Sequence, residues 1–209
     1  MSVLIGKSIG TVKEKPLPPG ARRACKAGGV EVARAAEGSD DGSMDLSRFQ
    51  ALDVVLVAGL PASGKSTFAR EHFARSGHRR VNRKEIRRFL YSMSHFGEPW
   101  HEADFNESDE ALVQHVERKI IEHLLHAGAK MLIDNTSVTV DSRAYYLQLA
   151  RQTKKRVGIL FLNTPVLKCI EQNRKRGDPV PESVISNLFA SVQLPTRAEG
   201  FEEALVITP

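Results

Sequence analysis

Eight residues that follow a short apolar run limit the folds open to this chain. Residues 53–58 are rich in β-branched side chains and too few for a helix, and they lead into Gly-Leu-Pro-Ala-Ser-Gly-Lys-Ser at 59–66. This segment fits the pattern G-x-x-x-x-G-K-[ST], and we expect a helix to begin near Gly64. In such a turn, backbone N–H groups and the positive end of the helix enclose a phosphate group. The sequence therefore predicts a phosphate-binding loop rather than a glycine-rich turn with an accidental lysine.

The residues of this loop have expected roles toward a nucleotide. Glycine tolerates backbone angles that a side chain would forbid, so successive N–H groups can turn toward the phosphates. Lys65 is expected to reach the β- and γ-phosphate oxygens, and the Ser66 hydroxyl is expected to bind Mg²⁺. Thr67 is expected to contact the α-phosphate side. The predicted nucleotide-binding residues are Gly59, Leu60, Pro61, Ala62, Ser63, Gly64, Lys65, Ser66 and Thr67.

After this loop, short apolar runs alternate with amphipathic segments, which is typical of a parallel sheet covered by helices. The predicted fold class is α/β, a P-loop NTPase domain with a five-stranded parallel sheet flanked by helices, similar to adenylate kinase. The expected strands are 53–58, a short one ending near Val81, 131–134, 157–162 and 204–207, and the expected helices begin near Gly64 or cover 84–91, 143–152, 166–175 and 181–191.

One further helix is expected between Ser108 and Gly128. Ser108 has a hydroxyl that can cap the first turn, and Gly128 is a typical residue at a helix end. The apolar residues between them recur at the spacing of one helix face. They are Leu112, Val116, Ile120, Leu124 and Leu125.

The first 46 residues differ from the rest, because they are rich in Gly, Pro, Ala and Ser and carry no sustained helical or strand period. We expect residues 1–46 to be disordered or weakly structured and residues 47–209 to form one folded domain. Met44 stands just before that domain, which suggests that translation begins there. An intact mass that begins at Met1 or Ser2 would contradict this start.

Composition excludes several other classes of protein. The apolar runs are far shorter than the ~20 residues of a membrane-spanning helix, and the first residues lack the apolar centre of a secretory signal. Cys25 and Cys169 lie far apart without metal-type spacing, which excludes a disulfide framework or a zinc knuckle. The net charge of +5 admits phosphate-rich partners without requiring them. We expect a cytoplasmic protein with no membrane partner and no obligate protein partner.

Six motifs occur in a fixed order along the chain. They are Gly-Leu-Pro-Ala-Ser-Gly-Lys-Ser-Thr-Phe at 59–68, Val-Asn-Arg at 81–83, Ile-Asp-Asn-Thr at 133–136, Asn-Arg-Lys-Arg at 173–176, Val-Pro at 180–181 and Pro-Thr-Arg-Ala-Glu-Gly-Phe at 195–201. Together they resemble the polynucleotide 5′-hydroxyl kinase family. The resemblance implies a kinase that binds ATP with Mg²⁺ and transfers its γ-phosphate to a hydroxyl, with single-stranded nucleic acid 5′ ends as acceptor. A small-molecule kinase of the same fold is the alternative.

The resemblance also assigns roles after the Asn-Arg pair, and here the chain departs from the family pattern. Family members carry an acidic general base at the position of Lys84 and an arginine that contacts the acceptor at the position of Arg87. A lysine is protonated at neutral pH and cannot accept a proton. Three accounts remain: a working kinase with Glu85 or Asp134 as base, a kinase for an acidic acceptor held by Lys84, or an ATP-binding protein without transfer.

Further site residues are implied by the same resemblance. Asp134 has the place of an acidic residue near Mg²⁺, with Ser66, although it could instead cap the following turn. Arg174 and Arg176 match the arginines of a mobile lid over the phosphates, and residues 195–201 resemble the part that lines the adenine pocket. The predicted catalytic residues are Lys65, Glu85, Arg87, Asp134, Arg174 and Arg176.

A basic cluster precedes and overlaps these residues, and a polyanionic acceptor would favour it. Three aromatic residues follow and could stack on a base, although helical aromatics are more often core. The alternative for the cluster itself is a solvated charged face. The basic residues are Arg79, Arg80, Arg83, Lys84, Arg87 and Arg88, and the aromatic residues are Tyr91, Phe96 and Trp100.

Overall fold

The computed structural model describes residues 45–208 of the 209-residue chain. The predicted disorder of residues 1–44, the start at Met44 and the surroundings of Cys25 therefore lie outside the described residues. At the beginning of the described part, Leu46 and Phe49 are buried. Phe49 belongs to the short helix α1 (Ser47–Gln50), which packs its apolar side against the domain core.

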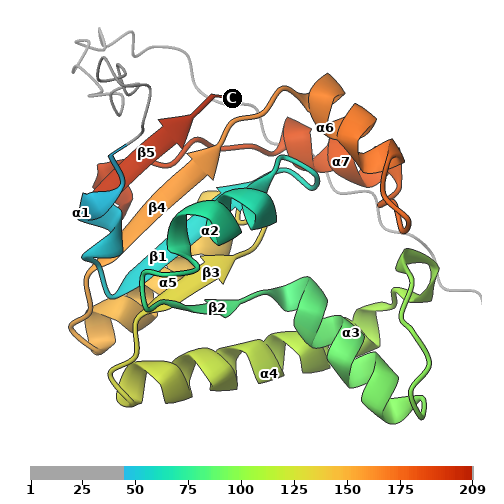
Figure 1. Cartoon of the computed structure of the whole chain (residues 1–209), viewed down its shortest axis with the longest axis horizontal. Coiled ribbons are helices and arrows are strands. Elements are labelled where there is room, and N and C mark those ends of the chain that lie inside the picture. Colours follow the sequence, from blue (N-terminus) through green and yellow to red (C-terminus); the bar gives the residue numbers. More distant parts are fainter. Residues whose placement is uncertain (1–44, 209) are drawn as a thin grey trace, which may run out of the picture. The chain divides into compact units, whose positions relative to one another are not determined.

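A five-stranded sheet with all neighbouring strands parallel forms the centre of the domain (Figure 1). The order β2-β3-β1-β4-β5 places the strand before the phosphate loop in the middle. This sheet confirms the predicted fold class. The strands are β1 (Val54–Gly59), β2 (Arg79–Val81), β3 (Met131–Asp134), β4 (Val157–Leu162) and β5 (Glu203–Ile207).

The helices connect the strands and agree with the expected segments to within a few residues at most ends. The third helix is longer than predicted, because it begins at Arg83 and continues to Ser94. The helices are α2 (Lys65–Phe73), α3 (Arg83–Ser94), α4 (Glu107–His126), α5 (Val140–Gln152), α6 (Val166–Arg174) and α7 (Glu182–Ala190), with 3₁₀ turns η1 (Glu102–Asp104) and η2 (Arg197–Glu199).

The alternation of side chains along β1 divides the core into two clusters. Val54, Leu56 and Ala58 belong to one cluster with residues of α4 to α7, whereas Val55 and Val57 belong to the other with residues of α1 and α2. Because successive strand residues point to opposite faces, both faces of the sheet are covered and every residue of β1 is buried. Burial on both faces explains why the strands read as continuous apolar runs.

Helix α4 corrects two expectations from the sequence. Its cap is Asn106 rather than Ser108, because the Asn106 side chain accepts a hydrogen bond from Asp109 N at 2.9 Å. In its earlier turns the buried face is also shifted by one residue, since Leu112 and Ile120 are 53% and 36% exposed, whereas Leu124 and Leu125 are buried as predicted. The shift escaped the apolar pattern because a buried carboxylate belongs to the true face. The buried residues of α4 are Val113, Glu117, Ile121, Leu124 and Leu125.

No helix within residues 45–208 combines the length and the apolar character that a membrane-crossing helix needs.

Gly158 on β4 offers a test of packing between the sheet and α1. A Cβ at this position would lie 3.2 Å from Phe49 Cδ1 of α1 and 2.5 Å from Leu52 Cδ1 just after it. Because the neighbours are packed, we expect Gly158→Ala to lower the free energy of unfolding by about 1–3 kcal/mol. Urea denaturation measures this change. Gly177→Ala is the matched control, since a Cβ there would meet nothing within 4 Å, and equal losses in both variants would contradict the packing.

Candidate active site

The phosphate loop runs from the carboxyl end of β1 into α2, as predicted. Gly59 and Gly64 have φ angles of 142° and 94°, which favour glycine. At Gly59 a side chain is also excluded by space, since a Cβ would lie 2.6 Å from the carbonyl oxygen of Leu162 on β4. The close approach of β4 therefore adds a second reason for glycine that the sequence does not reveal.

Lys65, at the first position of α2, is buried and points back into its own loop. Its ammonium group donates hydrogen bonds to Gly59 O at 3.0 Å and Leu60 O at 2.6 Å. Burial lowers the pKa of Lys65 to about 8; the Asp134 carboxylate opposes this shift and the Arg176 guanidinium adds to it. With a pKa of about 8, the Lys65 ammonium can lose its proton only slightly above neutral pH. The side chain lies next to the predicted phosphate site.

Asp134 ends β3 directly beside the loop, because its register places it opposite Val57 of β1. Its carboxylate is buried and Oδ2 accepts a hydrogen bond from Ser66 Oγ at 2.8 Å. The same oxygen accepts from Arg80 Nε at 2.9 Å and Nη2 at 2.6 Å. The side chain therefore turns toward Ser66 and Arg80 rather than capping the turn that follows it.

Ser66 and Asp134 present hydroxyl and carboxylate oxygens of the kind that bind a magnesium ion. Within residues 45–208, Asp134 Oδ1 is buried and accepts no hydrogen bond. Carboxylate and hydroxyl oxygens are the ligand types that Mg²⁺ takes in proteins, usually with several waters and the phosphates of the nucleotide. These residues fit such an ion. The same described residues contain no group of three or more His, Cys, Asp or Glu that could hold a metal by itself.

Arg80 was part of the basic cluster, but its role was missed. It joins Asp134 to Glu85, whose Oε1 lies 2.6 Å from Arg80 Nη1. The Glu85 side chain remains 61% exposed, whereas the Asp134 side chain has no exposed surface. The Arg80 guanidinium therefore binds both Glu85 and Asp134, the two carboxylates that the sequence offered as alternative bases. Glu85 is in contact with solvent, whereas Asp134 is not. Arg80 lies on the short edge strand β2, and no sequence pattern there indicated this arrangement.

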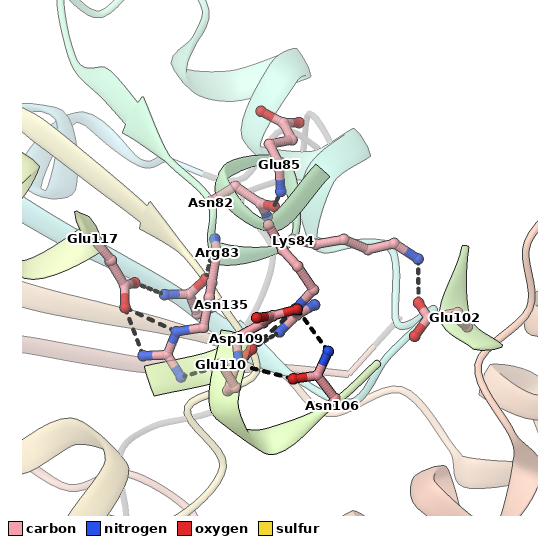
Figure 2. A network of polar contacts seen from close by, with 11 residues as sticks. Asn82, Arg83, Lys84, Glu85, Glu102, Asn106, Asp109, Glu110, Glu117 and Asn135 are labelled. Carbon is pink, nitrogen blue, oxygen red and sulfur yellow. Dashed lines mark hydrogen bonds and ion pairs between the residues drawn. The ribbon is translucent and has the colours of Figure 1, made fainter. Parts of the chain in front are cut away.

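The first turn of α3 is fixed by a buried polar network (Figure 2). Arg83 donates from Nε and Nη2 to Glu117 Oε2 at 2.8 and 2.6 Å, and Asn135 donates to Glu117 Oε1 at 2.5 Å. Tyr146 completes the network, and burial together with the Glu117 charge raises its pKa to about 12. Removing one partner of such a network leaves a buried charge unpaired. Glu117 thus holds α3 and the end of β3 in one frame.

Helix α3 is capped by Asn82, which also bonds to the end of β3. The Asn82 side chain accepts from Glu85 N at 3.0 Å and donates to Asp134 O at 2.6 Å. Beyond this cap, Lys84 and Glu85 leave the helix in different directions (Figure 2). Lys84 forms an ion pair with Glu102, and Glu85 turns to Arg80. Adjacent positions of α3 therefore bind different partners, Glu102 for Lys84 and Arg80 for Glu85.

Five of the six basic side chains of the cluster are paired with carboxylates from other segments. This pairing leaves much less free positive charge than the sequence suggested. Arg79 has no such ion pair in the described part of the chain. The pairs are Arg80 with Asp134 and Glu85, Arg83 with Glu117 and Glu110, Lys84 with Glu102 and Asp178, Arg87 with Glu110, and Arg88 with Asp178.

The aromatic residues after the cluster lie in three different settings. Trp100 is buried, with Lys84 Nζ at 5.4 Å and Arg87 Cζ at 5.2 Å from its ring centroid. Tyr91 stacks on His95 with a centroid distance of 3.9 Å, and Phe96 is fully exposed. Trp100 therefore packs beneath cations of α3 and its ring is covered. This finding removes it from the side chains that could stack on a base.

A cavity of about 1160 Å³ joins most of the predicted catalytic residues. Its lining includes Lys65, Ser66, Glu85, Arg87, Asp134 and Arg176. Arg174 does not line this cavity. It pairs with Glu182 at 2.6 Å, and both side chains are exposed. The sequence matched both arginines to the lid. The tertiary structure separates them into one that faces the cavity and one that does not.

The segment that resembles an adenine pocket is held by a buried arginine. Arg143 of α5 donates from Nε and Nη2 to the two carboxylate oxygens of Glu199 at 2.8 and 2.9 Å. Its Nη1 donates to the carbonyl oxygens of Ser137 and Gln193 at 3.1 and 3.0 Å. A fully buried arginine with four acceptors fixes this segment against the strand end. No motif in the sequence indicated Arg143.

Comparison with known proteins establishes the family. Residues 54–195 match the model of the family described as AAA domain. The chain is 24% identical over 160 residues to the bifunctional polynucleotide phosphatase/kinase of Schizosaccharomyces pombe. It is 21% identical over 142 residues to the L-seryl-tRNA(Sec) kinase of Methanococcus maripaludis. The solved structure of a sugar kinase from Janibacter sp. matches with a TM-score of 0.53 at 19% identity, over 75% of this chain and 85% of that chain.

The two curated relatives are longer proteins. The matches cover 71% and 68% of this chain, but only 32% and 53% of the relatives themselves. The fold and the phosphate loop define the described domain as a P-loop NTPase whose relatives include kinases. Because the family model matches more than half of its residues, this chain belongs to the AAA domain family.

The position of Lys65 predicts a pH dependence of ATP binding. Its ammonium form is present below the pKa of about 8 and is lost above it. Because only the charged form attracts phosphate, we expect ATP affinity to fall about tenfold between pH 7 and pH 9. Calorimetric titration with ATP and Mg²⁺ at both pH values measures the change. Lys65→Met should bind weakly without this dependence, while the exposed Lys119→Met should keep it; a constant wild-type affinity would contradict the prediction.

Proposed function

We propose that this chain is an ATP-dependent phosphotransferase that transfers the γ-phosphate to a hydroxyl acceptor bound beside α3. The observation that carries this proposal is one cavity of about 1160 Å³ with a shared lining. The lining includes Lys65 of the phosphate loop, Arg87 and Glu102, and also Arg176 from the turn between α6 and α7, which we call the lid turn. A nucleotide and an acceptor can therefore occupy one space, which an in-line transfer requires.

The cations of the cavity have a role in the proposed transfer. Negative charge spreads over the oxygens of the phosphoryl group in the transition state. Lys65 and Arg176 line the cavity where they can stabilise this charge. Ser66 and Asp134 would hold Mg²⁺, which supplies charge neutralisation at the phosphate oxygens. Preorganised charges of this kind are commonly the largest contribution to catalysis.

We propose Glu85 as the group that accepts the acceptor proton. Lys84 cannot do so while protonated, and Asp134 is buried and held by Ser66 and Arg80. Glu85 lines the cavity, keeps contact with solvent and receives only one ion pair, from Arg80. Because the transition state of phosphoryl transfer is loose, a base contributes about 10²–10⁴-fold. Transfer can therefore proceed without an acid at position 84.

For the acceptor, we propose the 5′-hydroxyl end of a single-stranded nucleic acid. The support is the motif series of the sequence and the identity of the two curated relatives, a polynucleotide phosphatase/kinase and a kinase for seryl-tRNA(Sec). A small hydroxylated metabolite is the second candidate. The pairing of Lys84 and Arg87 with carboxylates favours it, because paired cations attract a polyanion less strongly.

The acceptor can be found by direct competition. The full chain is incubated with γ-labelled ATP and Mg²⁺, with 5′-hydroxyl DNA and RNA oligonucleotides beside a panel of sugars and other hydroxylated metabolites. We expect label on an oligonucleotide. Label on a metabolite would select the second candidate, and ATP that is bound but not consumed with any acceptor would contradict the proposed transfer.

The two lid arginines provide a matched pair of variants. Arg176 lines the cavity whereas Arg174 pairs with Glu182 on the exposed side. We expect Arg176→Gln to lower kcat by about 10²–10³-fold, as for other groups that stabilise developing charge. Arg174→Gln should lower it by less than about fivefold, the range of an exposed ion pair. Steady-state kinetics with the identified acceptor compares them, and equal losses would contradict the separation of the two side chains.

A further inference from the structure

Asp178 lies in the turn between α6 and α7 and contacts two other parts of the chain. Its Oδ1 accepts a hydrogen bond from Glu102 N at 3.0 Å, and Oδ2 lies 3.5 Å from Lys84 Nζ and 3.3 Å from Arg88 Nη2. Although burial acts to raise it, the Glu102 N–H and the two cations hold the pKa of Asp178 below its ordinary value. We refer to Lys84, Arg88, Glu102 and Asp178 as the lid junction.

The other end of this turn is fixed independently. Asn173 is buried and exchanges two hydrogen bonds with Val180, donating to its carbonyl oxygen at 2.7 Å and accepting from its N–H at 3.1 Å. Arg176 N also donates to Asn173 O at 3.1 Å. Arg176 therefore lies between two attachments, Asn173 at the base of the turn and Asp178 at its tip. Only the attachment at Asp178 reaches the acceptor side of the cavity.

The two carboxylates of the lid junction are more sheltered than the side chains of the Arg174–Glu182 ion pair. The side chains of Glu102 and Asp178 are 15% and 19% exposed, against 67% and 46% for Arg174 and Glu182. An exposed ion pair contributes little to structure, because water and salt screen it. A sheltered carboxylate that accepts from a backbone N–H and lies near two cations is held more firmly.

Lys84 has a structural reason to be a lysine in this junction. Its ammonium lies between the carboxylates of Glu102 and Asp178. An acidic side chain at this position would bring three carboxylates together without the cation that separates them. Trp100, the single tryptophan of the chain, lies under the same ammonium. The position at which the family resemblance implies an acid is thus occupied here by part of the lid junction.

We propose that Asp178 is a positioning residue that holds Arg176 at the phosphate end of the cavity by attaching the lid turn to α3 and η1. Asp178 itself acts through the backbone of the turn and through Lys84. Because Glu102 and Lys84 also line the acceptor side, the position of Arg176 is linked to the acceptor wall. The consequence for turnover rests on the proposed function, while the attachment itself does not.

The test compares Asp178→Asn with Glu182→Gln, which makes the same chemical change on the exposed side of the lid. Hydrogen exchange of residues 175–180, Trp100 fluorescence and steady-state kinetics are measured on the full chain. For Asp178→Asn we expect about tenfold faster exchange, a shifted Trp100 emission and about tenfold lower kcat, with KM for ATP changed less than about twofold. Glu182→Gln should stay within about twofold of wild type in each measurement.

Lys84→Asp is the second variant, since it reverses the charge at the centre of the lid junction. We expect it to accelerate exchange at 175–180 and to lower phosphotransfer. Wild-type exchange and fluorescence in both Asp178→Asn and Lys84→Asp would overturn the proposal, as would a gain of activity in Lys84→Asp. If exchange and fluorescence respond as expected but even the wild-type chain transfers no phosphate, the proposed function fails and the attachment of the lid stands.

Discussion

The buried carboxylate of Asp134 is the interaction on which the arrangement of the site depends. It lies at the end of β3, beside the strand that leads into the phosphate loop, and accepts hydrogen bonds from Ser66 of α2 and Arg80 of β2. Its backbone oxygen accepts from Asn82, the cap of α3. A buried charge must be matched by donors that are held in place. The donors to Asp134 therefore fix the phosphate loop, the sheet edge and α3 relative to one another.

From this centre, paired charges extend along α3. Glu117 neutralises Arg83 from within the core, while Lys84 is paired with Glu102 and Asp178 at the cavity wall. A cluster that reads as free positive charge is therefore a set of fixed ion pairs between segments. Such pairs fix the directions in which these side chains extend from α3. They also give Lys84 two carboxylate partners, which explains a lysine at this position.

The sequence predicted the parallel sheet and its strands well, because strands buried on both faces stand out as apolar runs. On α4 it predicted Leu124 and Leu125 correctly but placed the earlier turns of the buried face one residue off, because Glu117 is charged and yet buried by its pair with Arg83. In the site, Lys65 and Ser66 were predicted from a motif of fixed local geometry, and Asp134 was predicted from the family resemblance. Arg80, Glu102 and Arg143 were missed as site residues, since each has a partner more than 15 positions away, namely Asp134, Lys84 and Glu199, and no local pattern marks them.

The sequence by itself determined the phosphate loop and the class of fold. These follow from residues close together in the chain, where backbone geometry and hydrophobic period operate directly. Tertiary structure alone decided that Arg176 rather than Arg174 faces the cavity, that Arg80 holds both candidate bases and that Asp178 attaches the lid. Each of these depends on which oppositely charged side chains meet across the fold, and burial determines the strength of that attraction.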